Sequence, residues 1–344
     1  MSGVVGEGAS PGAPGRRRRQ GRAPARTALA GNPSDGYGGA VLALTLDMLG
    51  ARVNLTQRSA ETRAAVGEVA EAEVAEAEAG VAEAEAGTAL IRRARRADSP
   101  QGGRLTRAVL ARAQREFGID TRGYGVRMVT SIPRSVGLGG SSAIVIATLR
   151  ALLDAHRVTL GALELAELAL SIEVDDLGIA AGLQDRLVQV HGGLMFMDFS
   201  GPRAVAERLP YDRLWPLLVA WRAETAAGSG IVHGDLRSRW SAGDPVVTAG
   251  MARLAGHARA ARVALLNADH AAFAAAVDGS FDVRAELMDL DPAHVAMVQA
   301  GRAAGAAVNY TGSGGAVVCA CEDSHHRDHV AEALRALGAE TVAA

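Results

Sequence analysis

The sequence predicts an α+β protein with two lobes. Segments with helical spacing of apolar residues interleave with short apolar segments typical of strands, and they do so without the regular repeat of a parallel α/β protein. The chain has 344 residues, of which 49% are hydrophobic, enough for one large domain or two ordinary ones. We expect the two lobes to divide near residue 191.

Two segments are predicted to lie outside the folded lobes. Residues 1–24 are rich in Gly and Pro, contain a run of arginines and have too few apolar side chains to order themselves, so we expect a disordered basic tail. Residues 60–97 are a low-complexity stretch of Ala and Glu in which VAEAEAG occurs twice in succession, and we interpret them as a surface insertion. The N-terminal domain is then expected at 25–190 and the C-terminal domain at 191–344.

The strands and helices are predicted from their periodicity. Residues 124–132 place apolar side chains at alternate positions, as a half-buried strand does, and 217–221 and 316–320 are short apolar segments. A helix is expected after the glycines at 137–140, because Val145, Leu149 and Leu152 recur at helical spacing. Further helices are predicted at 160–171, 251–267, 292–305 and in the last segment before Gly338.

Composition excludes several classes of protein. The formal net charge is -2, so there is no overall basic field that would attract nucleic acid. Cys319 and Cys321 are one residue apart in an apolar run, which rules out a disulfide framework. No apolar run approaches the roughly 18 residues of a membrane span, and the N-terminus lacks a hydrophobic signal region. We therefore expect a cytoplasmic protein that binds neither membrane nor nucleic acid, as a monomer or a homodimer.

The most informative stretch is residues 132–144, IPRSVGLGGSSAI, here called the second segment. Its glycines allow the backbone to approach an anion, and the helix that follows presents unpaired N–H groups to phosphate oxygens. Ser141 or Ser142 could reach a Mg²⁺ bound to the same phosphates. The alternative is an ordinary Gly-rich turn with a serine N-cap. No Lys follows, so this is not a P-loop, and it is not a GxGxxG fingerprint.

The second segment resembles the second motif of the GHMP kinase superfamily. Residues 25–39, ARTALAGNPSDGYGG (the first segment), resemble the first motif, and residues 310–315, YTGSGG (the third segment), resemble the third. All three occur in the right order on predicted loops beside strands. The resemblance implies a two-lobed GHMP kinase fold, with the phosphate-binding Gly-rich loop in the N-terminal lobe and a ferredoxin-like C-terminal lobe.

Longer strings resemble the glucuronokinase family, including GIAAGLQDRLVQVHGGL at 178–194 and SGIVHGDLRSRW at 229–240. This resemblance implies ATP-dependent phosphorylation of the anomeric hydroxyl of D-glucuronate, giving glucuronate 1-phosphate and ADP. The partners would be ATP and a small sugar acid, and Mg²⁺ would be the cofactor. A kinase acting on a heptose phosphate or on galactose, or a GHMP-fold sensor without catalysis, remains an alternative.

The resemblance also implies roles for individual residues. Asp185 is the candidate catalytic base, because a carboxylate can accept the hydroxyl proton while the γ-phosphoryl group transfers. Arg26 stands where some members have a lysine; it could stabilise developing charge or pair with Asp185 and hold it in place. Ser141 and Glu173 are the expected Mg²⁺ ligands, with Asp176 as an alternative to Glu173.

The remaining candidates fall into two groups. The expected contacts to the ATP phosphates are Gly137, Leu138, Gly139, Gly140, Ser141, Ser142, Gly312, Ser313 and Gly314. The expected contacts to the sugar are Asn32, Ser34, Asp35, Tyr37, Arg134, Gln184 and Thr311. An arginine suits the uronic carboxylate; we choose Arg134 ahead of Arg186, Arg237 and Arg239. The alternative for residues 32–37 is a surface turn, since these residue types are common turn formers.

Overall fold

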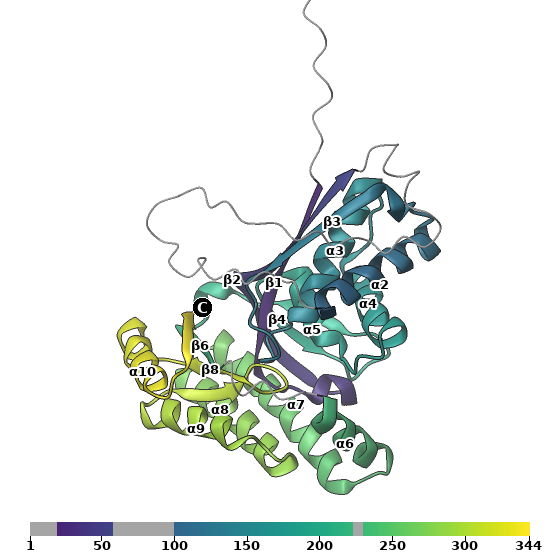
Figure 1. The fold of residues 1–344 in the computed structure, drawn as a ribbon. Helices are drawn as coiled ribbons and strands as arrows, with labels where there is room; N and C mark the ends of the chain where they lie inside the picture. The colour runs from purple at the N-terminus through teal and green to yellow at the C-terminus, as the bar shows by residue number, and fades with distance from the viewer. Residues whose placement is uncertain (1–18, 58–99, 223–229) are drawn as a thin grey trace, which may run out of the picture.

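Two antiparallel sheets, one in each lobe, organise the chain (Figure 1). The computed structural model describes residues 19–57, 100–222 and 230–344. The first sheet has the strand order β1-β2-β4-β5, with β3 also paired to β2, and the second has the order β7-β8-β6-β9. Within the described residues, no helix is both long and apolar enough to cross a bilayer.

The first sheet is built around one long strand. β2 (Ala40–Gln57) pairs along its length with β1 (Arg19–Ala30). On its other edge, its first residues pair with β4 (Leu194–Asp198) and its last residues pair with β3 (Tyr124–Thr130). β5 (Val205–Arg208) adds to β4 at the edge. Because β2 is shared, the strands before and after the second segment belong to one rigid unit.

Helices cover this sheet. α3 (Gly140–His156) packs directly on β1 and β2 and is buried over most of its length. α2 (Pro100–Phe117), α4 (Ala162–Ser171) and α5 (Leu183–His191) surround α3 (Figure 1). The apolar residues of α3 exclude water from the sheet, and this burial is the main driving force for placing α3 there. The N-terminus of α3 therefore has a defined position relative to β1.

The second sheet has the ferredoxin-like strand order. β6 (Leu217–Trp221) lies between β8 (Ala316–Ala320) and β9 (Glu340–Ala343), and β7 (Ala307–Tyr310) pairs with β8; all these pairs are antiparallel. Between β6 and β7 the described chain forms four helices: α6 (Gly230–Ser241), α7 (Pro245–Leu266), α8 (His270–Leu287) and α9 (Pro292–Ala303). The helix α10 (Ser324–Ala336) connects β8 to β9. The α+β fold class and the ferredoxin-like lobe are confirmed.

The predicted division of the lobes at residue 191 is wrong. β4 and β5 lie beyond that residue, yet they pair into the first sheet, and the chain passes to the second sheet only between β5 and β6. The reason is that the N-terminal half of β2 needs a partner on its second edge, and β4 supplies it.

The predicted tail is also too long. β1 begins at Arg19, which is in register with Leu55, so residues 19–24 are strand rather than tail. Their sequence has few apolar side chains, but pairing with β2 satisfies their backbone groups. Residues 1–18 of the expected tail and the insertion expected at 60–97 lie outside the described residues. The strands predicted at 217–221 and 316–320 match β6 and β8, and the helix predicted from residue 292 matches α9.

Candidate active site

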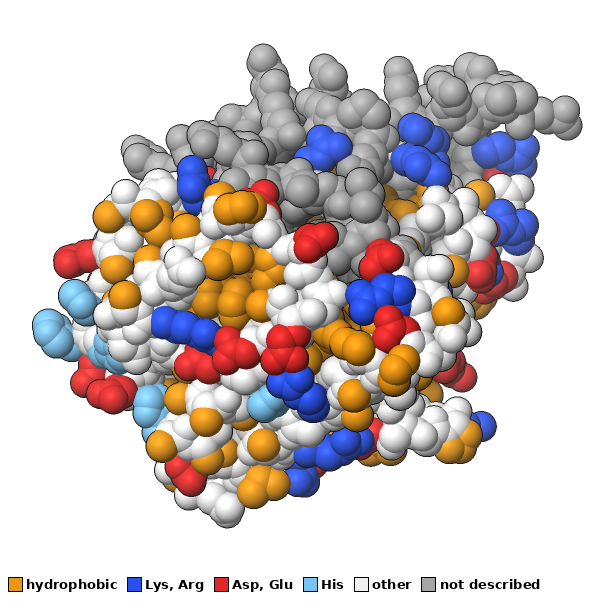
Figure 2. Space-filling view, turned by 90° about the horizontal axis from the view of Figure 1, so that it is seen from below, with side chains coloured by type: hydrophobic (Ala, Val, Ile, Leu, Met, Phe, Trp, Pro, Cys, Tyr) orange, Lys and Arg blue, Asp and Glu red, His pale blue; other side chains and the backbone are white. Residues whose placement is uncertain are grey.

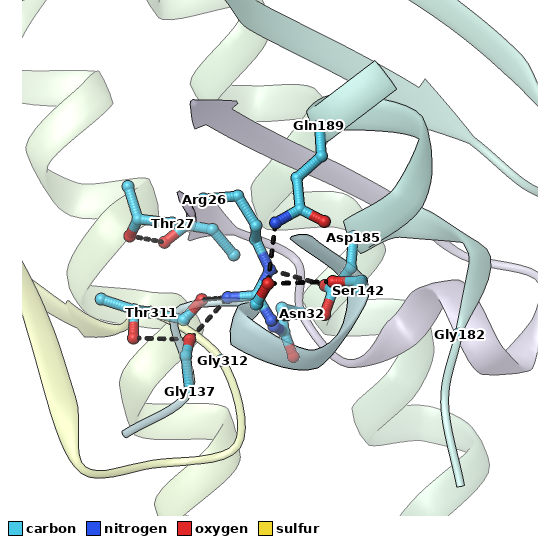
Figure 3. A network of polar contacts seen from close by, with 12 residues as sticks. Arg26, Thr27, Asn32, Gly137, Ser142, Gly182, Asp185, Gln189, Thr311 and Gly312 are labelled. Carbon is cyan, nitrogen blue, oxygen red and sulfur yellow. Dashed lines mark hydrogen bonds and ion pairs between the residues drawn. The ribbon is translucent and has the colours of Figure 1, made fainter. Parts of the chain in front are cut away.

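Arg26, on β1, lies at the centre of the polar network in Figure 3. Its Nε and Nη2 donate to Oδ1 and Oδ2 of Asp185 at 2.6 and 2.7 Å. Its Nη1 donates to the main-chain oxygens of Gly137 and Thr311 at 2.6 and 2.7 Å. The Arg26 side chain is only 6% exposed. One arginine of the first segment therefore contacts the second segment, the third segment and the candidate base.

Asp185 is placed by the start of a helix. It lies in the first turn of α5, whose N-cap is Gly182. The partial positive charge of a helix N-terminus favours a carboxylate there. The Asp185 side chain is 20% exposed, so it is held by Arg26 while remaining open to a ligand. A carboxylate has about four acceptor positions, and the pair with Arg26 leaves capacity to accept a proton from a hydroxyl.

The second segment presents a helix start without a side-chain cap. The N-cap of α3 is Gly139, with φ of 70°, and it makes no side-chain cap hydrogen bond. The serine N-cap considered above is therefore not found. Ser142 is buried and donates its Oγ to the oxygen of Gly139 at 3.1 Å, whereas Ser141 is partly exposed. The first amides of α3 suit an anion, and Ser141 is the better placed of the two hydroxyls to reach a ligand.

The second and third segments touch backbone to backbone. A Cβ added at Gly312 would lie 2.4 Å from the oxygen of Gly137, closer than any side chain allows. Thr311 is fully buried and its Oγ1 donates to the same oxygen at 3.0 Å. Thr311, expected to contact the sugar, instead joins the two segments. The glycine at 312 is required by this close approach.

After β1 ends at Ala30, the rest of the first segment forms a loop whose residues point in different directions. Ser34 is fully buried and donates its Oγ to the oxygen of Ala40 at 3.0 Å, so the expected sugar contact from this hydroxyl is replaced by a structural one. Asn32 is buried too, against Arg284. Tyr37 is partly exposed and packs edge-on against Trp240 of α6, with ring centroids 5.1 Å apart.

Asp35 lies beside Asp185, at the edge of the same network. Burial of its carboxyl, and next the negative charge of Asp185, raise the pKa of Asp35 to about 7, although Arg26 and the backbone amides of Gln184 and Gly36 oppose the shift. A Cβ added at Gly182 would lie 2.2 Å from Asp35 Oδ2. The site therefore contains two neighbouring carboxyl groups, of which Asp35 is partly protonated near neutral pH.

The expected metal ligands are only partly available. Glu173 is fully buried; its Oε2 accepts from Nε and Nη2 of Arg186, and its Oε1 has no hydrogen-bond partner in the described part of the chain. Asp176, the alternative ligand, pairs instead with Arg112 and Arg115. Among the described residues, no group of three or more His, Cys, Asp or Glu side chains could hold a metal by itself. A cation here would need oxygens from phosphates as well.

Two other sequence candidates have contrasting environments. Arg134 lies exposed in the second segment. Gln184 is buried, and its Nε2 has no hydrogen-bond partner among the residues that the structure describes. An unpaired buried donor is costly, so Gln184 is suited to a ligand oxygen.

Two residues of the network, Gln189 and Arg284, were not among those predicted from the sequence. Gln189, one turn after Asp185 on α5, donates its Nε2 to the oxygens of Gly139 and Pro24, both at 2.8 Å. Arg284, on α8, is buried and donates to Gly312. A signal for Arg284 exists in the sequence: it follows Val277 and Phe281 at helical spacing, so an arginine occupies a position on an apolar face.

Known proteins and a known family match different parts of the chain. Residues 104–193 match the model of the GHMP kinases N terminal domain. Glucuronokinase 1 of Arabidopsis thaliana is 41% identical over 206 residues, 56% of this chain and 56% of that protein. The D-glycero-alpha-D-manno-heptose 7-phosphate kinase of Campylobacter jejuni is 32% identical over 101 residues, 29% and 30% of the two chains. The match therefore spans little more than half the length of the plant relative.

A solved structure covers more of the chain. The phosphomevalonate kinase of Streptococcus pneumoniae has a TM-score of 0.70 at 12% identity and covers 94% of this chain and 98% of its own. At that identity the likeness concerns the fold alone. Both lobes therefore share the fold of the GHMP kinases.

Proposed function

We propose that this chain, which has the GHMP kinase fold and a GHMP kinase N-terminal domain at residues 104–193, transfers the γ-phosphoryl group of ATP to the anomeric hydroxyl of D-glucuronate. The observation that carries the proposal is the placement of Asp185. Its carboxylate is held by Arg26, which also contacts Gly137 and Thr311 in the two glycine-containing segments. A base beside a phosphate-binding backbone is the arrangement that phosphoryl transfer to a hydroxyl requires.

Each residue has a defined part in this reaction. The amides at the start of α3 would bind the phosphates, because an uncapped helix N-terminus attracts anions. Asp185 would accept the proton of the anomeric hydroxyl as the oxygen attacks the γ-phosphorus. The planar guanidinium of Arg26 would orient Asp185 and stabilise the negative charge that develops between the two segments. Asp35 and Nε2 of Gln184, which has no partner among the described residues, would hydrogen-bond sugar hydroxyls.

The oxygen atoms of the candidate ligands, Ser141 and Glu173, are of the type that binds a magnesium ion. Ser141 is partly exposed at the start of α3, and the buried Oε1 of Glu173 has no hydrogen-bond partner in the part of the chain that the structure describes. Hydroxyl and carboxylate oxygens are ligands that Mg²⁺ accepts together with phosphates. When bound, Mg²⁺ would neutralise part of the phosphate charge. Ser141 and Glu173 would hold it, with Arg186 restraining Glu173 through the other oxygen.

The carboxylate of the sugar requires a cationic partner. Arg134, exposed in the second segment, is our first choice. Arg237 is the second: it is exposed on α6, one turn before Trp240, and its charge acts on Tyr37 of the first segment. The two arginines can be distinguished by substitution, because the true partner would affect glucuronate binding far more than glucose binding.

The proposal is tested by ADP release with Mg-ATP and a panel of sugars. We expect turnover with glucuronate to exceed that with glucose, galactose and galacturonate. Arg134→Met should raise KM for glucuronate more than KM for ATP, and Arg237→Met is the matched comparison. Absence of turnover with every free sugar, from a protein that binds ATP, would refute the proposal.

A second candidate is favoured by one finding. The match to the heptose 7-phosphate kinase of Campylobacter jejuni suggests a sugar phosphate as substrate. The same assay separates the candidates, because a heptose kinase would release ADP with a phosphorylated heptose and not with glucuronate.

A further inference from the structure

Arg284 is a buried cation that belongs to no ion pair in the described part of the chain. It is 1% exposed, and its hydrogen bonds go to neutral oxygens. Its buried Nε has no hydrogen-bond partner among the described residues, and the guanidinium lies over the ring of Tyr310, 5.2 Å from the centroid. Burial, and to a lesser extent the charge of Arg26, lower the pKa of Arg284 to about 10, so it remains charged at pH 7. Burying a cation outside an ion pair costs free energy, so we expect Arg284 to have a role that offsets this cost.

The strongest contact of Arg284 is with the third segment. Its Nη2 donates to the oxygen of Gly312 at 2.7 Å, and its Nη1 makes longer contacts to the main-chain and side-chain oxygens of Asn32, at 3.4 and 3.3 Å. The preceding oxygen, of Thr311, accepts from Arg26 at 2.7 Å. Two arginines thus hold two consecutive carbonyl groups of the third segment.

The direction of a carbonyl determines the direction of the next amide. In a planar trans peptide the C=O and the following N–H point in opposite directions. If Arg284 holds the oxygen of Gly312, the N–H of Ser313 is turned away from Arg284. The nitrogen of Ser313 lies beside the second segment, because a Cβ added at Gly137 would be 3.0 Å from it. Successive outward amides of this kind attract anions.

We propose that Arg284 is a positioning residue for nucleotide binding: by holding the oxygen of Gly312 it aims the amide of Ser313 at the phosphates bound by the second segment, without itself touching them. This inference rests on the proposed function, since it assumes that the second segment binds a nucleotide. Through Asn32, Arg284 also joins the first segment to the third. Nucleotide affinity then depends on a side chain of α8 that is remote in sequence from all three segments.

The test measures Mg-ADP binding by calorimetry in the full chain, with no sugar present. We expect Arg284→Met to weaken ADP binding at least tenfold. Arg284→Lys keeps the charge but loses the planar fork, and it should weaken binding about three- to tenfold. The matched control is Arg302→Met: Arg302 also lies over an aromatic ring, that of Phe281, and it pairs with Asp278 and Asp282. The control should bind ADP within twofold of wild type.

Thermal unfolding without ligand separates positioning from stability. A purely structural role would lower the unfolding midpoint of Arg284→Met and leave the ADP affinity of the folded protein unchanged. ADP affinity within twofold of wild type in either folded variant at position 284 would overturn the inference; the lysine variant provides this readout if the methionine variant does not fold. A wild-type protein that binds no ADP would refute the proposed function and the inference together, whereas wild-type binding with unaffected variants refutes the inference alone.

Discussion

Arg26 and Asp185 form a two-point ion pair that links β1 to the first turn of α5, with N–O distances of 2.6 and 2.7 Å. The residues are 159 positions apart in the sequence. Because the third nitrogen of Arg26 also contacts Gly137 and Thr311, this pair sets the position of the candidate base relative to the backbone of the second and third segments. We expect substitution of Asp185 and substitution of Arg26 to have different effects.

Asp185→Asn should abolish proton acceptance while keeping a hydrogen-bonding side chain beside Arg26. We expect kcat to fall by about 10²- to 10⁴-fold, with ADP affinity within a few fold of wild type. Initial rates and calorimetry measure the two quantities. Full turnover by the Asn variant would exclude Asp185 as the base.

Arg26→Met should destabilise the protein, because it leaves Asp185 and two main-chain oxygens without their donor. Loss of one partner from a largely buried pair costs about 3 kcal/mol. Urea unfolding measures the change in the free energy of unfolding. The control is Arg253→Met, since the pair of Arg253 with Glu286 is about half exposed on both sides and should contribute much less to stability because solvent screens it. Equal losses in both variants would contradict a central role for Arg26.

Gly312→Ala should damage the junction of the second and third segments. The new Cβ would lie 2.4 Å from the oxygen of Gly137 and 2.8 Å from Nη1 of Arg26, so the backbone must move. We expect KM for ATP to rise at least tenfold. Gly256→Ala is the control, because this exposed position on α7 has open space around it, and alanine there should stabilise the helix by about 0.5–1 kcal/mol. An unchanged KM in the Gly312 variant would show that the junction does not support nucleotide binding.

The raised pKa of Asp35 should make the free energy of unfolding depend on pH. Its pKa is about 7 in the folded protein, against an ordinary value of 3.8 for an aspartate. The folded state therefore binds more protons between these pH values, and Asp35 makes the protein less stable as pH rises from about 4 to about 7. Asp35→Asn cannot ionise and should remove this loss. We expect the substitution to be more favourable at pH 8 than at pH 5, by about 1–3 kcal/mol.

Urea unfolding at the two pH values measures this difference. The same free-energy change at pH 5 and pH 8 would show that Asp35 ionises in the folded protein as readily as in the unfolded chain.

Acidic and basic side chains are interspersed over the described residues on the face drawn in Figure 2. This agrees with the formal net charge of -2.

The sequence by itself determined the local features of this protein. Periodicity located β6, β8 and α9, since alternation and helical spacing depend only on neighbouring residues. Two of the motif-like segments supplied the glycines and the first supplied Arg26, while the string at 178–194 supplied Asp185. The resemblance also left open an ion pair between Arg26 and Asp185.

Only the tertiary structure decided which elements pair and which polar side chains are buried. Residues 194–208 were expected in the other lobe, because strand pairing with β2 is a contact over some 150 positions, for which local patterns give no signal. Ser34 was expected to contact the sugar, because the sequence of a turn does not show whether a serine hydroxyl faces solvent or, as here, the oxygen of Ala40. Arg284 was not among the predicted residues, because the role of a buried arginine depends on the carbonyl oxygen that it contacts in the folded protein. Hydrophobic spacing is a property of the chain, whereas burial and hydrogen-bond partnership are properties of the packed fold.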